Sequence, residues 1–314
     1  MGEEPSKPIA SSTILQGDAK TLLTDIPDKS VKLILTSPPY NVGKAYERGM
    51  FASLEAYTDW MEGLIETLLE KVTDDGHICW QVGNYVSDGA LTPLDYIFFP
   101  IFAKRGCYLR NRIIWRFNFG LHAQRRFSGR YETLLWMSRS KDYAFNLDPI
   151  RVRQLYPGKR HSKSKGDRAG QPSGNPLGKN PSDYWEFDAE AAFFGEPVWN
   201  IPNVKANHLE RSDHPCQFPS ELADRCILAM TDVGDVVLDP FAGAGTSVIC
   251  AEGRGRVGVG FELDKAHADE AIARLEKFRR GELPLRWSGA PPIRPNQADR
   301  VARIPDEWLQ EAAE

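Results

Sequence analysis

Apolar and polar positions along the first third of the chain predict strands that alternate with a helix. Residues 31–36 (VKLILT) form a nearly continuous apolar run, which is typical of a buried strand. Apolar residues then recur at every third or fourth position from 54 to 72, the spacing of an amphipathic helix. The triplet Asp-Asp-Gly at 74–76 is expected to interrupt that helix, and residues 77–82 predict the next strand.

The same alternation continues along the rest of the chain. The apolar run from Tyr96 to Ala103 contains a proline and is expected to be buried core. Strands alternating with helices predict an α/β fold with a parallel or mixed sheet. The remaining strands are predicted at 13–17, 111–117, 133–137, 235–239 and 257–261, and the remaining helices at 218–230, 246–252 and 265–280.

Residues 151–213 depart from this pattern. They are rich in Gly, Pro, Ser and Lys and show no apolar periodicity, and an uninterrupted loop of this length is usually functional or disordered. The chain is therefore predicted to consist of a first half at 13–150, a loop-rich insert at 151–213, a second half of the same domain at 214–282, and a proline-rich tail at 283–314.

Overall composition excludes several classes of protein. The 314 residues are 41% hydrophobic and 26% charged, which is ordinary for a globular chain and unlike a disordered one. No apolar run approaches the ~18 residues of a membrane span, and the polar N-terminus MGEEPSKPIA predicts no secretory signal. The five cysteines are odd in number and form no CxxC pair, so a reduced, cytoplasmic protein without a bound metal is expected.

The net charge of −4 conceals a basic middle segment. Between Lys104 and Pro181 there are 18 Lys and Arg against 4 Asp and Glu, a local charge of +14. This asymmetry predicts a face that binds nucleic acid, and a solvated basic surface is the alternative. The residues predicted to contact phosphates or bases are Arg125, Arg126, Arg130, Lys159, Arg160, Lys163 and Lys165.

A strand, a glycine loop and a helix start follow one another at 236–247 (VVLDPFAGAGTS). Glycines let the backbone approach a ligand closely, and a helix N-terminus offers free N–H groups. Glu262 lies 19 residues after Gly243, where such folds hold the two hydroxyls of a ribose. The residues predicted to bind a cofactor here are Asp239, Pro240, Phe241, Gly243, Gly245, Thr246, Ser247 and Glu262.

Three kinds of ligand use such a loop. An ATP P-loop needs a lysine after its last glycine, and a dinucleotide loop needs a third glycine where Val248 stands. The acidic Asp239 opposes a pyrophosphate but suits a cationic amino-acid moiety. S-adenosyl-L-methionine carries an ammonium and a sulfonium and no phosphate, so it is the favoured cofactor, with a purely structural turn as the alternative.

The second candidate site is the sequence Thr-Ser-Pro-Pro-Tyr at 36–40, directly after an apolar strand. Two consecutive prolines fix the chain and cannot donate backbone hydrogen bonds, so their carbonyls form a rigid acceptor set with Ser37 Oγ. Tyr40 adds a flat face. Acceptors beside a stacking ring suit an exocyclic amine, because holding its hydrogens can rotate the amine and expose its lone pair to a methyl sulfonium. Ser37, Pro38, Pro39 and Tyr40 are therefore the predicted catalytic residues, and an ordinary Pro-Pro turn is the alternative.

As an ordered set, these motifs resemble those of the DNA amino-methyltransferases in their permuted β-class order. In that family an SPPY or DPPY motif comes first, the target-recognition region follows, and the cofactor motif comes last, as TSPPY, the basic insert and DPFAGAGTS do here. HPCQFP at 214–219 resembles the family's HPxQxP motif, and Gly17-Asp18 resembles a motif near the cofactor adenine. The segments RNRIIW (110–115), RRFSGRYETLLW (125–136) and GKNPSDYW (178–185) are also similar, and the departures are Phe218 for a frequent Lys and Tyr131 for a frequent His.

The resemblance, over about residues 13–280, implies an α/β, Rossmann-like fold with a mostly parallel twisted sheet. It also implies an S-adenosyl-L-methionine-dependent enzyme that flips a base out of a specific double-stranded DNA sequence and methylates its exocyclic amine directly. It adds Asp18, His214, Gln217 and Pro219 to the expected cofactor residues. Serine at position 37 goes mostly with cytosine N4 in that family, so cytosine N4 is favoured. RRFSGRYE and GKNPSDYW resemble adenine enzymes, so adenine N6 is the alternative. The resemblance also suggests a homodimer, a cognate restriction endonuclease and a location at the nucleoid.

Other functions fit part of the pattern. Pro215-Cys216-Gln217 is also the nucleophile tripeptide of cytosine-C5 methyltransferases, but there it normally follows the cofactor motif. Methylation of RNA or of a protein glutamine uses the same chemistry, although the glutamine enzymes typically carry NPPY after the cofactor motif. A catalytically silent nucleic-acid-binding protein would not need both intact motifs, and a nicotinamide dehydrogenase would need the missing third glycine.

Overall fold

The computed structural model describes residues 9–40, 51–117, 123–154, 156–161, 166–185, 212, 217–285 and 287. Ten strands lie within these residues: β1 (Thr13–Gln16), β2 (Val31–Thr36), β3 (Val72–Val82), β4 (Asn84–Ser87), β5 (Ala90–Pro93), β6 (Tyr108–Arg116), β7 (Tyr131–Ser138), β8 (Tyr184–Trp185), β9 (Val236–Asp239) and β10 (Val257–Glu262). The α-helices of the same residues are α1 (Ala19–Leu22), α2 (Leu54–Lys71), α3 (Leu94–Lys104), α4 (Ser220–Met230), α5 (Thr246–Gly253) and α6 (Lys265–Arg279).

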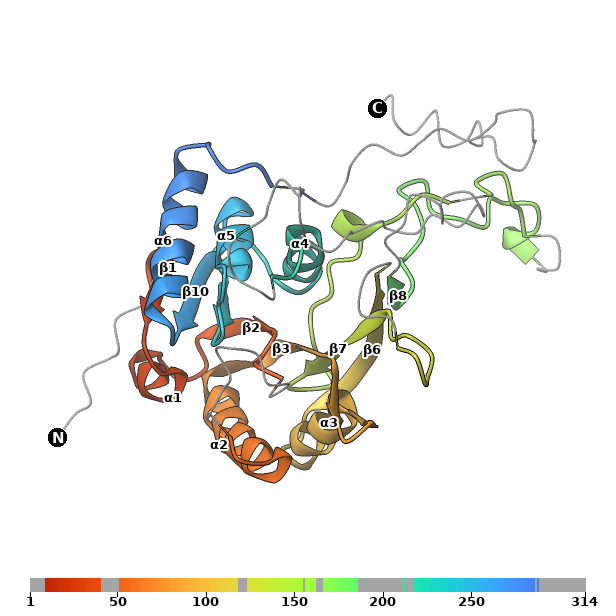
Figure 1. The fold of residues 1–314 in the computed structure, drawn as a ribbon. Helices are drawn as coiled ribbons and strands as arrows, with labels where there is room; N and C mark the ends of the chain where they lie inside the picture. Colours follow the sequence, from red (N-terminus) through yellow and green to blue (C-terminus); the bar gives the residue numbers. More distant parts are fainter. Residues whose placement is uncertain are drawn as a thin grey trace.

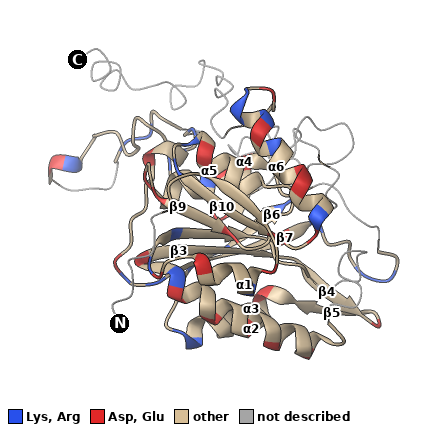
Figure 2. Ribbon diagram, turned by 90° about the vertical axis from the view of Figure 1, so that its left-hand side faces the viewer, with Lys and Arg blue, Asp and Glu red and all other residues tan. Residues whose placement is uncertain are grey.

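Eight of the strands form one mixed sheet in the order β1-β10-β9-β2-β3-β7-β6-β8 (Figure 1). The strands from β1 to β3 are mutually parallel, and β7 is antiparallel to both of its neighbours. Figure 2 shows this sheet as a middle layer, with α1, α2 and α3 on one face and α4, α5 and α6 on the other. The α/β fold with a mostly parallel sheet is therefore confirmed. None of the described helices is long and apolar enough to cross a lipid bilayer.

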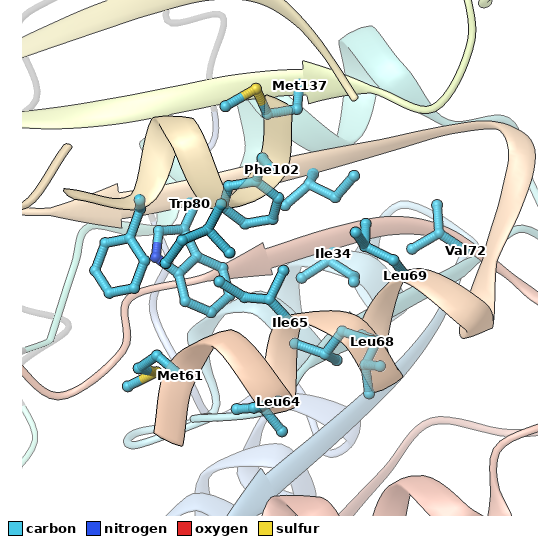
Figure 3. Close-up of a cluster of buried hydrophobic side chains, with 14 of the residues drawn as sticks. Ile34, Met61, Leu64, Ile65, Leu68, Leu69, Val72, Trp80, Phe102 and Met137 are labelled. Carbon is cyan, nitrogen blue, oxygen red and sulfur yellow. The ribbon is translucent and has the colours of Figure 1, made fainter. Parts of the chain in front are cut away.

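Both faces of the sheet are buried, as expected for parallel strands. In β2 only Lys32 is not buried; Ile34 packs into one apolar cluster, and Leu33 and Leu35 pack into the other. Figure 3 shows the first cluster, in which the buried side of α2 faces the sheet and α3. The fully buried members, worth about 1.5–3 kcal/mol each, include Met61, Leu64, Ile65, Leu68, Trp80 and Phe102.

The strand order reverses between β9 and β2. β9 leads through α5 to β10 on one side, and β2 leads through α2 to β3 on the other. Open α/β sheets bind their ligands at such a switch point, beyond the carboxyl ends of the strands. Thr36 ends β2 and Asp239 ends β9, and the Thr36 hydroxyl donates a hydrogen bond of 2.6 Å to Asp239 Oδ1. The fold therefore joins the two sequence motifs at the position where a ligand is expected.

Most of the elements expected from the sequence are confirmed, and two local expectations are wrong. The triplet at 74–76 does not separate α2 from the next strand: α2 ends at Lys71, β3 begins at Val72, and the triplet lies inside β3 as an irregularity in its pairing with β2. Residues 96–103 belong to α3, and they are not uniformly core, because Tyr96 is 74% exposed and Phe99 is 40% exposed. An apolar run inside an amphipathic helix still has an outward face.

The described part of the insert is dominated by loops, as expected, but it has an internal order. The chain runs outward and returns, with bridges between Val152 and Lys179 and between Arg160 and Pro172. It then adds β8 to the edge of the sheet, parallel to β6. In Figure 1 this excursion extends away from the sheet beyond β6 and β8. The insert is thus attached to the sheet at its base and projects from it.

Candidate active site

A cavity of about 390 Å³ lies at the switch point, beyond the carboxyl ends of β1, β2, β9 and β10. Its walls come from both sequence motifs and from the segments after β1 and β10. Among the predicted site residues, those that line it are Asp18, Ser37, Pro38, Pro39, Tyr40, Gln217, Pro240, Phe241, Gly243, Thr246 and Glu262. The cavity therefore brings the predicted catalytic set and most of the predicted cofactor set to one place.

Tyr40 is fixed by contacts at its ring and at its hydroxyl. A Cβ atom on Gly83, just after β3, would lie 3.1 Å from Tyr40 Cε2, so the glycine leaves room for the ring. The Ser37 and Tyr40 hydroxyl oxygens are 3.0 Å apart. The rigid Pro38-Pro39 pair connects the two residues, so the hydroxyls and the ring are held as one unit.

Glu132 does not line the cavity but contacts Tyr40 behind it, and it is not among the site residues predicted from the sequence. The Tyr40 hydroxyl donates to Glu132 Oε2 at 3.3 Å, and Gln81 Nε2 donates to the same oxygen at 2.7 Å. Gln81 on β3 is 3% exposed, and Glu132 lies at the start of β7. The glutamate is 92 positions from Tyr40, so only the antiparallel pairing of β7 with β3 brings them together.

Asp239 supports the cofactor loop from below and does not line the cavity. Its fully buried carboxylate accepts hydrogen bonds from the Thr36 hydroxyl (2.6 Å), from the Phe241 backbone N–H (3.1 Å) and from the Ser247 hydroxyl. Burial raises the pKa of Asp239 to about 6, against these three hydrogen bonds, which favour the charged form. A direct contact with a cationic cofactor was expected for Asp239, but in the structure this residue does not line the cavity. Asp239 and Ser247 instead tie the loop to β2.

Glu262, at the end of β10, is the predicted carboxylate that does face the cavity. One oxygen accepts from the Gly243 backbone N–H and the other from the Asp264 backbone N–H, both at 2.9 Å. Burial raises the pKa of Glu262 above its ordinary value. Each carboxylate oxygen can accept two hydrogen bonds, so both retain capacity for a ligand hydroxyl.

Glycines beside the cofactor loop serve packing as well as turning. Gly245 has a φ of 74°, and a Cβ atom there would lie 2.8 Å from Ile14 Cδ1, so it faces β1 and not the cavity. A Cβ atom on Gly258 would lie 2.7 Å from the Val248 Cα atom. The close approach of helix and strand, for which a dinucleotide fold uses its third glycine, is achieved here by a glycine on β10.

The remaining predicted cofactor residues have separate positions. Asp18 caps α1 by accepting from the Thr21 N–H at 3.2 Å, and Gln217 Oε1 accepts from the Ser212 backbone and hydroxyl at 3.0 and 2.8 Å. Pro219 caps α4 without lining the cavity. His214 lies outside the described residues.

The lining residues define the charge that the cavity accepts. Three carboxylates, Asp18, Glu262 and Asp264, stand against one ammonium, Lys265. A phosphate would therefore be opposed, whereas a cationic ligand with hydroxyl groups suits the set. Trp60, which sequence reasoning missed, adds an aromatic wall, and its ring centroid is 6.3 Å from that of Phe241. Among the described residues there is no group of three or more His, Cys, Asp or Glu arranged to hold a metal ion.

The predicted nucleic-acid contacts gather partly on the loop between β6 and β7. Arg125 and Arg126 are exposed, and no described residue forms a hydrogen bond or ion pair with either. Phe127 beside them is 99% exposed, and the Arg130 carbonyl accepts from the Phe117 N–H at 2.9 Å to close the loop.

On the insert, Lys159 is exposed and Arg160 donates to the Gly170 carbonyl at 2.9 Å; Lys163 and Lys165 lie outside the described residues.

Part of the basic charge of this region is used inside the protein. Arg105 pairs with Glu62 at 2.9 Å, and Arg151 pairs with Asp148 at 2.6 Å. Arg112 pairs with the buried Asp95. The face available to a polyanion is therefore narrower than the local charge of +14 implied, and it includes Arg125 and Arg126.

The comparisons with known proteins agree with this geometry. Residues 31–273 match the DNA methylase family. The chain is 44% identical over 259 residues to the Type II methyltransferase M.BglII of Bacillus subtilis, covering 82% of this chain and 67% of that one. It superposes on the PvuII cytosine-N4-specific DNA methyltransferase with a TM-score of 0.62 at 18% identity, over 91% of this chain and 97% of the other. A DNA modification methylase of Thermus thermophilus, complexed with S-adenosyl-L-methionine, gives a TM-score of 0.56 at 26% identity, over 88% and 97%.

The fold is that of S-adenosyl-L-methionine-dependent methyltransferases. The chain belongs to the DNA methylase family and is a site-specific DNA methyltransferase.

Proposed function

We propose that this enzyme methylates cytosine N4 within a specific sequence of double-stranded DNA, using S-adenosyl-L-methionine and a base turned out of the helix. The observation that carries the proposal is the meeting of the Ser37–Tyr40 set with the Glu262 carboxylate in one cavity. The first set suits an amine on a flat ring, and the second suits a ribose. Supporting this assignment, Ser37 carries a neutral hydroxyl, and serine at this position goes mostly with cytosine N4 in the resembled family.

The cofactor half of the cavity fits the proposed ligand. S-adenosyl-L-methionine, when bound, supplies a methyl group activated by its sulfonium. Glu262 would accept the ribose hydroxyls, and the Trp60 and Phe241 rings offer aromatic faces that attract a cation. The carboxylates of the lining exclude phosphate-bearing cofactors, which also disfavours the dehydrogenase alternative.

The catalytic half acts on the amine through acceptors and a stacking face. The Tyr40 ring stacks on the flipped base, and Ser37 Oγ accepts an N–H of the exocyclic amine together with the proline carbonyls. Holding both hydrogens turns the nitrogen lone pair out of the ring plane, toward the methyl group. The N–C bond then forms as the S–C bond breaks with its electron pair left on sulfur, and the methylated nitrogen loses one proton.

The DNA-facing loop supplies charge and an apolar wedge. Arg125 and Arg126 contact phosphates, and part of the insert reads base edges in the major groove. Phe127 packs against the stack that the flipped base leaves, as inserted apolar side chains do in other DNA complexes. Glu132 lies five positions after it in the sequence, a span of at most about 17 Å for an extended chain.

Adenine N6 is the second candidate, because the segments RRFSGRYE and GKNPSDYW resemble adenine enzymes. Methylation-aware sequencing of DNA from cells that express the protein, followed by nucleoside mass spectrometry, decides between the two bases and gives the recognition sequence. N4-methylcytosine is expected, and N6-methyladenine without N4-methylcytosine would overturn the assignment. Absence of either modified base would contradict the whole proposal.

The division of the chain and its partners follow from the same proposal. Residues 13–150 and 214–282 build the catalytic and cofactor halves, 151–213 the recognition region, and 283–314 a tail. We further propose that the enzyme forms a homodimer, that it has a companion restriction endonuclease, and that it is located at the bacterial nucleoid. Light scattering of the purified protein tests the dimer.

A further inference from the structure

Four side chains form a continuous chain of hydrogen bonds behind the proposed target amine. Ser37 Oγ lies 3.0 Å from the Tyr40 hydroxyl, which lies 3.3 Å from Glu132 Oε2. Gln81 Nε2 donates to that same carboxylate oxygen at 2.7 Å. The 3.3 Å contact is long for O–H···O, as catalytic hydrogen bonds often are in a ligand-free site.

The carboxylate fixes the direction of this chain. A carboxylate can only accept, so the single proton of the Tyr40 hydroxyl points to Glu132. The Tyr40 oxygen is then left as an acceptor, and the Ser37 proton points to Tyr40. The lone pairs of Ser37 Oγ remain, and they can only accept. This is the polarity that an N–H of the target amine requires.

We propose that Glu132 is a positioning residue for methyl transfer, which acts through Tyr40 to hold Ser37 as an acceptor and which takes up the proton that the methylated amine loses. The inference rests on the proposed function, in which Ser37 holds the amine. A family member with aspartate in place of Ser37 has a charged acceptor in direct contact with the amine. Here the charge of Glu132 is two hydrogen bonds from Ser37, and so three from the amine, and it lies on β7, whereas Ser37 follows β2.

The proton transfer balances along the chain. The methylated nitrogen gives its proton to Ser37 Oγ, the Ser37 proton passes to the Tyr40 oxygen, and the Tyr40 proton passes to Glu132 Oε2. Both hydroxyls are regenerated with their orientation reversed, and Glu132 becomes a neutral carboxyl. Loss of that proton to water restores the carboxylate and the original direction of the chain for the next turnover.

Two neighbours keep the carboxylate in place. Gln81 is buried in β3 and donates to the same Glu132 oxygen that faces Tyr40. A Cβ atom on Gly83 would lie 3.1 Å from the Tyr40 ring and 3.7 Å from Glu132 Cγ, so this glycine leaves the space in which the two meet. The relay therefore depends on the end of β3 as well as on the motif itself.

Tyr40→Phe is the main test, because it keeps the stacking ring and removes only the relay. The experiment measures the single-turnover rate on a duplex that carries the recognition sequence in unmethylated form. DNA and S-adenosyl-L-methionine are titrated separately. Tyr40→Phe and Glu132→Gln should each lower the rate on the order of 10²-fold and leave both affinities unchanged. The double variant should be no slower than either single variant, because both break one chain. Tyr131→Phe, which removes an exposed hydroxyl from the neighbouring residue, is the matched control and should match wild type.

Ser37→Ala separates this inference from the proposed function. If Ser37→Ala turns over like wild type, the proposed catalytic site is wrong. If Ser37→Ala loses turnover while Tyr40→Phe keeps it, the site stands and the relay is overturned. In the Ser37→Ala background, Tyr40→Phe should cause no further loss; a further loss would mean that the hydroxyl only orients the ring, which also overturns the relay. Thermal unfolding of each variant excludes a folding defect, and Tyr40→Phe alone decides if Glu132→Gln does not fold.

Discussion

The proposed cofactor side and the proposed DNA-facing side of this enzyme are built in opposite ways. On the cofactor side, the Asp239 carboxylate is fully buried and is hydrogen-bonded inside the protein. On the DNA-facing side, Arg125, Arg126 and Phe127 project into solvent. A small ligand requires a shape that exists before it arrives, whereas a polyanion is attracted over a distance by unpaired charge. Internal bonding therefore marks one side, and exposed charge marks the other.

The largest expected effect lies between the two sides, at the catalytic set. Ser37→Ala should lower the methylation rate on the order of 10²–10³-fold, as the loss of other positioned hydrogen-bonding groups does. Tyr40→Ala should lower it further than Tyr40→Phe, because stacking is lost as well. Calorimetry should find S-adenosyl-L-methionine binding unchanged in both variants. A parallel loss of cofactor affinity would place these residues on the cofactor side of the comparison.

Asp239→Asn tests whether ionisation of the buried Asp239 carboxyl lowers the stability of the folded protein. Because burial raises the pKa of Asp239 to about 6, the folded protein binds more protons than the unfolded chain between about pH 4 and 6. Stability contributed by this group is therefore present at low pH and is lost as pH rises through that window, by roughly 3 kcal/mol. Asparagine cannot ionise. Between pH 4 and 7, the free energy of unfolding of Asp239→Asn should rise relative to wild type by up to this amount, measured in urea.

The measurement must be a difference between variants, because His77 titrates with the opposite sign. Burial lowers the pKa of His77 to about 4, and its ring accepts from Trp136 Nε1 at 3.2 Å and lies 3.0 Å from the Ala144 carbonyl. The unfolded chain protonates this histidine first, so its contribution to stability is lost as pH falls from about 6.5 to 4. The two groups oppose each other in wild type. A difference between wild type and Asp239→Asn that stays constant with pH would refute the assignment to Asp239.

Glu262→Ala should weaken S-adenosyl-L-methionine binding by about 1.5–3 kcal/mol, the range for a hydrogen bond to a charged group. The expected cause is loss of the ribose contacts, since Glu262 faces the cavity and Asp239 does not. Calorimetry measures the effect, and Glu276→Ala on α6, which removes an exposed carboxylate, is the control. Equal affinity in Glu262→Ala and wild type would remove Glu262 from the cofactor site.

Phe127→Ala tests whether this exposed ring acts as a wedge during base flipping. Loss of the wedge should raise the cost of base flipping by about 1–3 kcal/mol, the value of one aromatic stacking contact. The loss of DNA affinity should shrink on a duplex in which the target base is mismatched, because a mismatched base is already partly unstacked. Val233→Ala, at another exposed apolar residue (77%), serves as the control. An equal loss on matched and mismatched duplexes would assign Phe127 a role in DNA contact without flipping.

The smallest effect is expected in the salt dependence of DNA binding. Each neutralised phosphate contributes about −0.9 to the slope of log affinity against log salt. Combining Arg125→Ala with Arg126→Ala should make that slope shallower by about 1.8. Lys277→Ala with Arg280→Ala removes the same charge from the exposed end of α6 and should leave the slope unchanged. An unchanged slope in the Arg125→Ala and Arg126→Ala double variant would indicate that the insert makes the phosphate contacts.

Local patterns were sufficient for much of this protein. The strand at 31–36 and the helix at 54–71 follow from apolar spacing, because burial on two faces or on one stripe imposes that spacing. The catalytic and cofactor motifs could be located because their chemistry lies within a few consecutive residues. The order of the two motifs was sufficient to indicate the family.

Only the tertiary structure decided which side chains face the cavity. Asp239 and Glu262 both read as cofactor carboxylates, and packing turned one under the loop and the other into the cavity. Glu132 lies in a segment that resembles the family, but its contact with Tyr40 could not be predicted, because the two meet only after β7 has paired with β3. Burial and contacts between distant strands depend on where the whole chain packs, and no local period or motif encodes them. The sequence by itself thus determined most of the elements, the motifs and the class of chemistry, and the fold assigned each polar group its direction and its partner.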